Sequence, residues 1–285
     1  MPYMVRNLTS YDDMLAVPKL QTEIWGLENG NVGLYPPMLS MAAKSGGTVL
    51  GAFDADSGDM VGFLFGFLGR EPGGPLKLCS QTMGVRKAWR GLGIAEHLKR
   101  AQLEQAKKAD LPLITWTYDP LEAPNAHLNL HKLRAISRTY WCDIYGEHFG
   151  RLNAGLPTDR LLAEWWVGGE RLKRLADEDG QLEAEAQPVF EVDCCGLNRR
   201  ITSMRLDLCA PALILDTVVD LQAVKQVSLE LAHDWRIKVR QAFETYFARD
   251  YIAVDFISTL QNGERRNRYL LRKATPELID DIGML

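Results

Sequence analysis

The spacing of apolar residues along the first 167 positions predicts alternating strands and helices. A short strand from Met4 to Asn7 precedes a helix that begins at Ser10, because a serine three residues before Asp13 is a common N-terminal cap. Pro18 lies inside that helical pattern, so we expect a kink or a break there. A second helix is expected from Pro36 to Lys44, where two glycines soon follow.

A hairpin and a strand-turn-helix unit are expected next. Two apolar runs, Thr48 to Phe53 and Met60 to Leu68, flank a cluster of turn residues. The strand-like run from Leu76 to Val85 leads through glycines into a helix from Leu92 to Ala109. After a short break, Pro112 to Tyr118 has the composition of another strand.

The rest of this half predicts a helix from Asn125 to Ala135 and strands at Thr139 to Tyr145 and Arg160 to Val167. The composition then becomes acidic and helical between Gly168 and Pro188, with few large apolar residues, which indicates a linker. We therefore expect a first α+β domain over residues 1–170, a linker over 171–187 and a smaller α/β domain over 188–285.

The last hundred residues show a second series of elements. Strands are expected at Val189 to Val192 and Ala212 to Val219, and helical periodicity predicts one long helix from Leu221 to Arg249. Two further apolar runs, Ile252 to Ile257 and Tyr269 to Leu271, predict closing strands around an Asn-Gly turn.

Composition narrows the classes of protein that the chain can represent. Its 285 residues are 46% apolar and 25% charged with a net charge of −4, which is typical of a globular protein without nucleic-acid or membrane partners. No apolar run approaches the roughly 18 to 20 residues that span a bilayer, and the N-terminus does not resemble a secretory signal. We expect a cytoplasmic protein. Its scattered cysteines, without a C-x-x-C pair, favour reduced thiols and no metal: Cys79, Cys142, Cys194, Cys195 and Cys209.

The glycine turn after the Leu76 to Val85 strand carries the clearest chemistry. A glycine turn that opens a helix presents bare N–H groups that suit a phosphate, and Arg90 stands at its mouth. A tight turn without function is the alternative. No Lys-Ser/Thr pair follows Gly93, which disfavours a Walker loop, and Glu96 replaces the third glycine of a dinucleotide motif.

The string Arg90-Gly91-Leu92-Gly93-Ile94-Ala95 resembles the acyl-CoA motif Q/R-x-x-G-x-G/A of the GNAT superfamily of N-acyltransferases. That superfamily has a mixed, splayed central sheet with flanking helices in the order β-α-α-β-β-β-α-β-α-β-β, which is the order predicted above. The resemblance implies acetyl-CoA or another acyl-CoA as cofactor. It implies that the main chain of Leu92, Gly93, Ile94 and Ala95 holds the coenzyme A pyrophosphate beside Arg90 and Gly91, and that Met83, Val85 and Asn125 flank the pantetheine arm.

The same resemblance implies a reaction zone between Ser80 to Val85 and Thr115 to Asp119, where the fourth and fifth strands splay apart. The glutamate and tyrosine that many relatives use are missing, since the fourth strand has no carboxylate and Leu130 replaces the tyrosine. The catalytic candidates are therefore the nearest substitutes: Asp119, Tyr118 and His131. Structural hydrogen bonding is the alternative for the histidine, and a turn for the aspartate.

Candidate acceptor-binding residues flank these segments. Trp25 and Tyr35 border the loop that closes over the acceptor in this superfamily, and Arg134 and Arg138 suit a substrate carboxylate. Core packing explains the aromatic residues equally well, and surface solvation explains each arginine taken singly.

The strings YDPLEAPNAHLNLHKLRA and GLPTDRLLAEW are similar to a bacterial subgroup of acyltransferases with a C-terminal extension. This resemblance implies transfer of an acetyl or succinyl-type group to a small-molecule amine, such as an amino acid, by direct attack on the thioester. A protein or aminoglycoside acceptor is one alternative, and a catalytically silent acyl-CoA sensor is another. Phe243 to Asp255 resembles a GNAT helix entering its sixth strand, which predicts a degenerate half-repeat without a second coenzyme site. A homodimer is compatible with the sequence.

Overall fold

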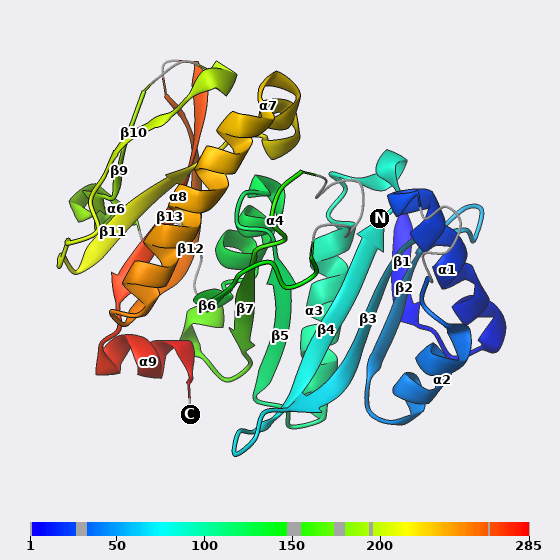
Figure 1. Cartoon of the computed structure of the whole chain (residues 1–285). Helices are drawn as coiled ribbons and strands as arrows, with labels where there is room; N and C mark the ends of the chain where they lie inside the picture. The colour runs from blue at the N-terminus through cyan, green and yellow to red at the C-terminus, as the bar shows by residue number, and fades with distance from the viewer. Residues whose placement is uncertain are drawn as a thin grey trace. The chain divides into compact units, whose positions relative to one another are not determined.

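The computed structural model describes residues 2–26, 33–146, 155–173, 180–193, 196–261 and 263–284. Contacts divide the chain into two compact units, Met1–Trp116 and Thr117–Leu285, with the boundary inside strand β5 (Leu113–Tyr118) (Figure 1). The domain boundaries expected at residues 170 and 188 stay a prediction. Up to β7 the elements follow the β-α-α-β-β-β-α-β-α-β-β order, which confirms the α+β class and the order of elements expected from the sequence.

The strands of unit 1 form a sheet in the order β1-β2-β3-β4-β5. They are β1 (Tyr3–Asn7), β2 (Thr48–Asp54), β3 (Met60–Arg70), β4 (Leu76–Val85) and the first part of β5. Neighbours from β1 to β4 pair antiparallel, which includes the predicted β2–β3 hairpin. The pairing of β4 with β5 is parallel and joins Leu78 to Ile114 and Cys79 to Thr115.

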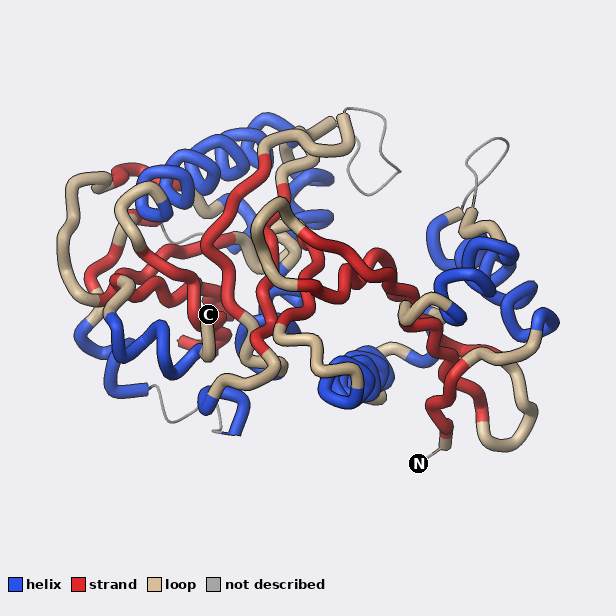
Figure 2. The backbone as a smooth tube through the Cα atoms, turned by 90° about the horizontal axis from the view of Figure 1, so that it is seen from below, coloured by secondary structure: helices blue, strands red, loops and turns tan. Residues whose placement is uncertain are grey.

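Helices cover both faces of this sheet, as Figure 2 shows for α3 on one side and α1 and α2 on the other. The helices are α1 (Tyr11–Trp25), α2 (Pro36–Lys44), the short η1 (Lys87–Trp89) and α3 (Ile94–Lys108). Successive side chains of a strand point to opposite faces, so Phe63 packs in the core under α1 and α2 while Leu64 packs against α3. Two apolar layers therefore enclose the sheet.

Helix α1 decides between the two alternatives expected at Pro18. It starts at the expected cap, where Ser10 Oγ accepts a hydrogen bond from Asp13 N at 3.1 Å, and it continues through Pro18, so the expected break is wrong while the kink stays a prediction. Proline removes one N–H from the helix, and burial of Met14, Val17 and Leu20 in the core favours keeping the two halves in one continuous helix.

Unit 2 contains a second series of strands, in the order β7-β6-β12-β13-β11-β8, and a two-stranded ribbon of β9 and β10. The bounds are β6 (Ile136–Trp141), β7 (Arg160–Trp166), β8 (Gln187–Pro188), β9 (Phe190–Val192), β10 (Ile201–Met204), β11 (Ala212–Thr217), β12 (Tyr251–Gln261) and β13 (Glu264–Lys273). Strand β6 ends four residues before the predicted Tyr145, because Asp143 adopts a φ of 45° and its carboxylate accepts from Thr158 N at 2.9 Å. Residues 142–145, which the sequence pattern predicts as the end of this strand, form a turn.

The helices of unit 2 also differ from prediction. They are α4 (Ala123–Ala126), the π-helix η2 (His127–Lys132), η3 (Glu170–Lys173), α6 (Gly180–Glu185), η5 (Gly196–Asn198), α7 (Leu221–Val227), α8 (Leu229–Phe247) and α9 (Pro276–Ile282). The single long helix expected from Leu221 is wrong: extended Ser228, with φ −159° and ψ 116°, separates α7 from α8. Strand β10 and helix α9 were not expected.

Unit 2 repeats one arrangement of elements. The α4–η2 segment leads into the antiparallel pair β6–β7, and α7–α8 leads into the antiparallel pair β12–β13. Strands β6 and β12 lie next to each other and antiparallel, through Ser137 and Ala253. A strand precedes each series: β5, which ends at Tyr118, precedes α4, and β11 precedes α7. This is the order that the predicted half-repeat requires.

Candidate coenzyme and acyl-transfer site

The turn between β4 and α3 is held open by two glycines. Gly91 has a φ of 82° and Gly93 a φ of 81°, the left-handed region that side-chain-bearing residues rarely adopt. Among the residues that the structure describes, a Cβ at Gly91 would meet nothing within 4 Å, and one at Gly93 would meet only the Tyr3 hydroxyl at 3.8 Å. The space beside this turn is therefore free for a ligand to approach the main chain.

The first turn of α3 has no internal cap. Gly93 is its N-cap and provides no side-chain hydrogen bond, and an N–H of this helix first reaches back at His97, which donates to Gly93 O at 3.0 Å. The N–H groups before His97 point out of the helix end, where the dipole contributes about half a positive charge. Ile94 is buried, whereas Leu92 is 51% exposed. This arrangement suits an anion such as a pyrophosphate.

Two side chains, Tyr3 and Arg90, donate hydrogen bonds to main-chain oxygens in and just before this turn. The Tyr3 hydroxyl donates to Leu92 O at 3.4 Å, and its ring meets His97 edge-on with centroids 5.7 Å apart. Burial, followed by the nearby Glu96 carboxylate, raises the pKa of Tyr3, so the phenol stays a neutral donor. Arg90 Nε donates to Val85 O at 3.2 Å, which ties the exposed guanidinium to the end of β4.

Strand β4 has a bulge and a free edge where the sequence predicts the pantetheine contacts. The register with β3 jumps from Thr82 to Ser80, so Gln81 is an extra residue that bulges from the strand. Parallel pairing with β5 ends at Cys79 and Thr115. The next residues of β4, including the predicted Met83 and Val85, continue beyond that pairing, as a splayed sheet requires.

A buried lysine of α3 lies next to Ser80, just beyond the last residue of β4 that pairs with β5. Lys99 is 2% exposed, and its Nζ donates to Ser80 Oγ at 2.8 Å and lies 3.5 Å from the ring centroid of Trp116. Burial lowers the pKa of Lys99 well below its usual value. Sequence analysis missed this residue, although its spacing from Leu103 and Ala106 places it on the apolar face of the helix.

An apolar groove of about 480 Å³ lies on the opposite face of the unit 1 sheet. Its lining comes from α2 and the residues that flank it, and from β3 and β4: Leu34, Met38, Met41, Ala42, Ser45, Phe65, Phe67 and Gln81. Of the predicted acceptor residues, Tyr35 is 62% exposed and precedes α2. The Trp25 ring packs edge-on against Phe63 at 5.9 Å, and only a glycine at position 84 lets it approach β4 so closely. Residues 27–32 of the predicted acceptor loop fall outside the described residues.

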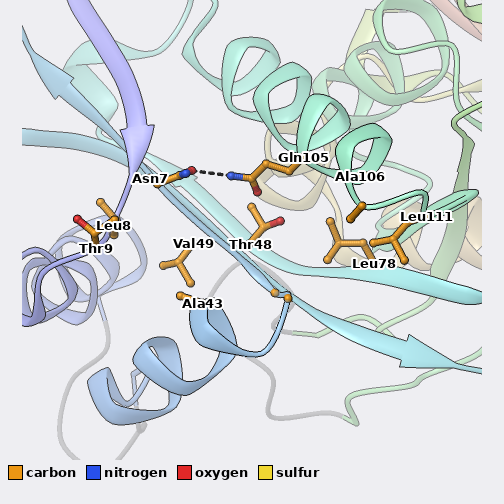
Figure 3. A pocket seen from close by; sticks show the side chains of 13 residues that line it. Asn7, Leu8, Thr9, Ala43, Thr48, Val49, Leu78, Gln105, Ala106 and Leu111 are labelled. Carbon is orange, nitrogen blue, oxygen red and sulfur yellow. Dashed lines mark hydrogen bonds between the residues drawn. The ribbon is translucent and has the colours of Figure 1, made fainter.

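A second cavity, of about 200 Å³, lies beside the C-terminal half of α3 (Figure 3). Asn7 and Gln105 point toward each other across it, and Gln105 Nε2 donates to Asn7 Oδ1 at 2.5 Å. Thr48, Leu78 and Ala106 also line it. None of the predicted site residues lies in its wall.

In unit 2 the candidate base Asp119 is 7% exposed and firmly held. Its Oδ2 accepts from Arg236 Nη2 at 2.6 Å and lies 3.5 Å from Arg160 Nη1, while its Oδ1 accepts from Leu121 N at 2.8 Å. These contacts describe a structural anchor for the end of β5. A neighbouring carboxyl, Glu122, accepts from Gln222 Nε2 at 2.7 Å, and burial raises the pKa of Glu122.

The other two catalytic candidates also have partners within unit 2. Tyr118 is 4% exposed with its hydroxyl 3.3 Å from Ser137 Oγ, and burial raises its pKa well above the usual value. His131 Nδ1 lies 3.1 Å from Asp255 Oδ1, and the His131 ring stacks on His127 with centroids 4.6 Å apart. Their catalytic roles stay predictions.

The two predicted carboxylate-binding arginines are each committed to an acid. Arg134 Nη1 lies 3.5 Å from Asp255 Oδ2, and Arg138 Nε donates to Glu164 Oε1 at 3.0 Å. Asn125 is exposed in α4, where its N–H donates to the main-chain oxygen of residue 122. Among the residues that the structure describes, no cluster of three or more His, Cys, Asp or Glu could hold a metal ion, and no helix is long and apolar enough to cross a membrane.

Comparison with known proteins finds likeness in structure alone. No family model matches the chain, and no curated protein matches it. The acetyltransferase of GNAT family from Streptococcus pneumoniae is 17% identical, with a TM-score of 0.45 over 58% of this chain and 99% of that one. The structure of yncA from Salmonella typhimurium with its cofactor acetyl-CoA is 15% identical, with a TM-score of 0.46 over 59% and 95%. The ribosomal-protein-S18-alanine N-acetyltransferase from Escherichia coli is 10% identical, with a TM-score of 0.44 over 58% and 94%.

Proposed function

We propose that this chain is an acyl-CoA-dependent N-acyltransferase that transfers an acetyl or succinyl-type group to the amine of a small molecule. The observation that carries the proposal is the uncapped start of α3, where Gly91 and Gly93 leave the main chain open directly behind the end of β4. A helix start of this kind is built for a phosphate-bearing ligand rather than for packing.

The coenzyme fits the residues present. The N–H groups of residues 92–95 would hold its pyrophosphate, Arg90 would pair with a phosphate oxygen, and the β4 edge at Met83 and Val85 would hydrogen-bond the pantetheine amides. When bound, acyl-CoA supplies a thioester, which activates the acyl group for attack by an amine. The chain then has to orient the acyl carbonyl and keep the amine neutral.

Proton removal from the amine needs an acceptor whose pKa is close to the working pH. Burial raises the pKa of the Glu122 carboxyl, which moves that group toward this condition, whereas Asp119 accepts a hydrogen bond from Arg236. Asp119, Tyr118 and His131 stay candidates for the acid and base.

The apolar groove of unit 1 supports a small amine with an apolar side chain, such as a hydrophobic amino acid. Its volume of about 480 Å³ suits a small molecule, and Met38, Met41, Phe65 and Phe67 provide most of its wall. An aminoglycoside is a polycation and needs acidic contacts, whereas the described residues that line the groove include no Asp or Glu. The groove therefore favours the small apolar acceptor over that alternative.

Two measurements on the purified chain test the proposal. Calorimetric titration should show binding of coenzyme A, and acetyl-CoA or succinyl-CoA should release free thiol when a panel of hydrophobic amino acids is added. Binding without thiol release for any amine would favour the silent acyl-CoA sensor. Absence of coenzyme binding would overturn the proposal.

A further inference from the structure

The cavity beside the C-terminal half of α3 combines a polar mouth with an apolar interior (Figure 3). All of its described lining residues belong to unit 1, and the exposed Asn7 and the half-buried Gln105 lie at its mouth. The larger buried apolar residues of its wall are Leu8, Val49, Leu78 and Leu111. A cavity of about 150 Å³ holds a benzene ring, so a volume of about 200 Å³ also has room for a polar group on such a ring.

The opening exists because β1 ends before it reaches the start of β2. The pairing of the two strands ends at Asn7 and Leu50, after which the chain turns into α1, capped by Ser10. Thr48, where β2 begins, therefore lies beyond the end of β1. The space that a longer β1 would fill is part of the cavity.

Hydrogen bonds within the main chain fix the walls of the cavity. Gly47 N donates to Ala42 O at 2.8 Å just after α2, and Leu111 N donates to Ala106 O at 3.0 Å just after α3. A Cβ at Gly47 would come within 2.7 Å of Gly66 O, so the close approach of this wall to β3 requires a glycine. The cavity is thus formed before any ligand binds, as is usual for small-molecule sites.

Uncharged hydrogen-bonding groups are left free in this cavity. Gln105 Nε2 donates to Asn7 Oδ1, which leaves Asn7 Nδ2 as a donor and Gln105 Oε1 as an acceptor. Turning both amides over would still leave one donor and one acceptor. Thr48 is only 2% exposed, and its hydroxyl has no hydrogen-bond partner among the residues that the structure describes. Buried hydroxyls seldom stay unpaired, so this group also calls for a ligand atom.

The chemistry of the lining selects an uncharged ligand. Among the described residues of the wall there is no Asp, Glu, Lys, Arg or His, so an ion would lose its water without gaining a counter-ion. A primary carboxamide carries an acceptor oxygen and a donor nitrogen on one carbon, which complements the free donor and acceptor at the mouth.

We propose that this cavity is a small-molecule site for an uncharged primary carboxamide with a compact apolar body. The carboxamide oxygen accepts from Asn7 Nδ2, its N–H donates to Gln105 Oε1, and the Thr48 hydroxyl pairs with the same group. The apolar body packs on the inner wall. Gln105 lies about 18 Å along α3 from Gly93, at 1.5 Å per residue, so the site is separate from the glycine turn and does not depend on the proposed function.

The first test titrates three ligands into the unaltered chain without coenzyme. Benzamide is the carboxamide probe, benzoate has nearly its shape but carries a charge, and toluene lacks the hydrogen-bonding group. We expect benzamide to shift the NMR signals of the Asn7 and Gln105 side-chain amides and to bind at least about tenfold more tightly than either of the others. Unchanged signals up to the solubility limit of benzamide would mean that the cavity holds water only and would overturn the inference. Equal affinity for benzoate or toluene would overturn it as well.

The second test removes the polar groups one at a time. Gln105→Leu deletes the amide on a helix former, and Thr48→Val deletes the hydroxyl while keeping the branched shape. Each should weaken benzamide binding about fivefold and leave toluene binding nearly unchanged. Lys108→Gln is the control on the same helix, because Lys108 is exposed and is not in the cavity wall. Benzamide affinity that stays unchanged in both variants would overturn the inference, and if one variant does not fold, the other decides together with the ligand comparison.

Discussion

The helix that follows β4 in unit 1 and the helix that follows β11 in unit 2 differ in what satisfies their first N–H groups. At α7, Asp220 Oδ1 accepts from Ala223 N at 3.0 Å, so the helix start is closed by its own side chain. At α3, Gly93 has no side chain to offer and the groups stay available. A cap that comes from the chain is typical of a structural helix, and a missing cap on a glycine turn indicates an external anion.

The junction between β5 and α4 in unit 2 is held by the buried ion pair of Asp119 with Arg236. Removing this ion pair should give the largest loss of stability. Asp119→Ala removes the partner of Arg236, whose side chain is 1% exposed, and leaves that charge buried without compensation. We expect a loss of about 3–5 kcal/mol in the free energy of unfolding, measured by urea denaturation.

Asp234→Ala on α8 is the control for Asp119→Ala. It removes the partly exposed partner of Lys238 and should cost less than about 0.5 kcal/mol. An Asp119→Ala variant of unchanged stability that had lost activity would show that this carboxylate is catalytic rather than structural.

Placing a charged side chain at the open junction should abolish its function. Gly93→Asp keeps a residue type that tolerates a positive φ but brings a carboxylate to the phosphate position. Repulsion should weaken coenzyme A binding at least about 100-fold, equivalent to about 2.7 kcal/mol, in a calorimetric titration. Gly93→Asn has nearly the same shape without the charge and should weaken binding less. Equal losses in the two variants would show that shape, not charge, controls this site.

Replacing Lys99 by methionine should stabilise the chain at neutral pH by about 1 kcal/mol, because a costly buried amine is removed. Burial lowers the pKa of Lys99 from its ordinary 10.5, so between the lowered pKa and pH 10.5 the unfolded chain holds a proton that the folded chain does not. The free energy of unfolding of the unaltered chain therefore rises with pH toward 10.5, and the advantage of Lys99→Met shrinks. Thermal and urea unfolding between pH 7 and 10 measure the difference. A constant difference over that range would mean that Lys99 does not change its protonation on folding.

A small effect on stability, and none on coenzyme binding, is expected at the start of α7, where Asp220 caps the helix. Asp220→Ala should cost about 1 kcal/mol of stability in urea denaturation, which is the usual contribution of an N-cap. Coenzyme A affinity should stay unchanged, since the Asp220 side chain accepts a hydrogen bond from the first turn of this helix and no external anion is needed there. A weakened affinity would show that the two junctions are not as different as their caps indicate.

Local patterns made the first half of the fold predictable, because hydrophobic periodicity and turn chemistry agree there. Strand β4 begins and ends at the predicted residues, and the glycine turn leads into α3 as expected. The break at Ser228 escaped prediction because the apolar spacing continues across it, although Ser228 also caps α8 through Leu231 N at 3.1 Å. A serine in a helical pattern reads equally well as an interior residue or as a cap.

The candidate site was predictable only where a motif involves the main chain. The residues of the glycine turn form one continuous feature, since their chemistry needs no distant partner. The burial of Lys99 and Gln102 could not be predicted, because a lysine or glutamine on a helix is normally solvated. Only the packing of α3 against β3 and β4 buries them. The arginines suggested for a substrate carboxylate are held by Asp255 and Glu164, acids from strands that no local pattern links to them.

The adjacency of β6 and β12 also affects how copies of this chain can associate. An exposed strand edge invites backbone pairing with another molecule. Here the edge of β6 that faces away from β7 is occupied by β12 of the same chain. Where Ser137 pairs with Ala253, that edge is not available for strand addition by another molecule.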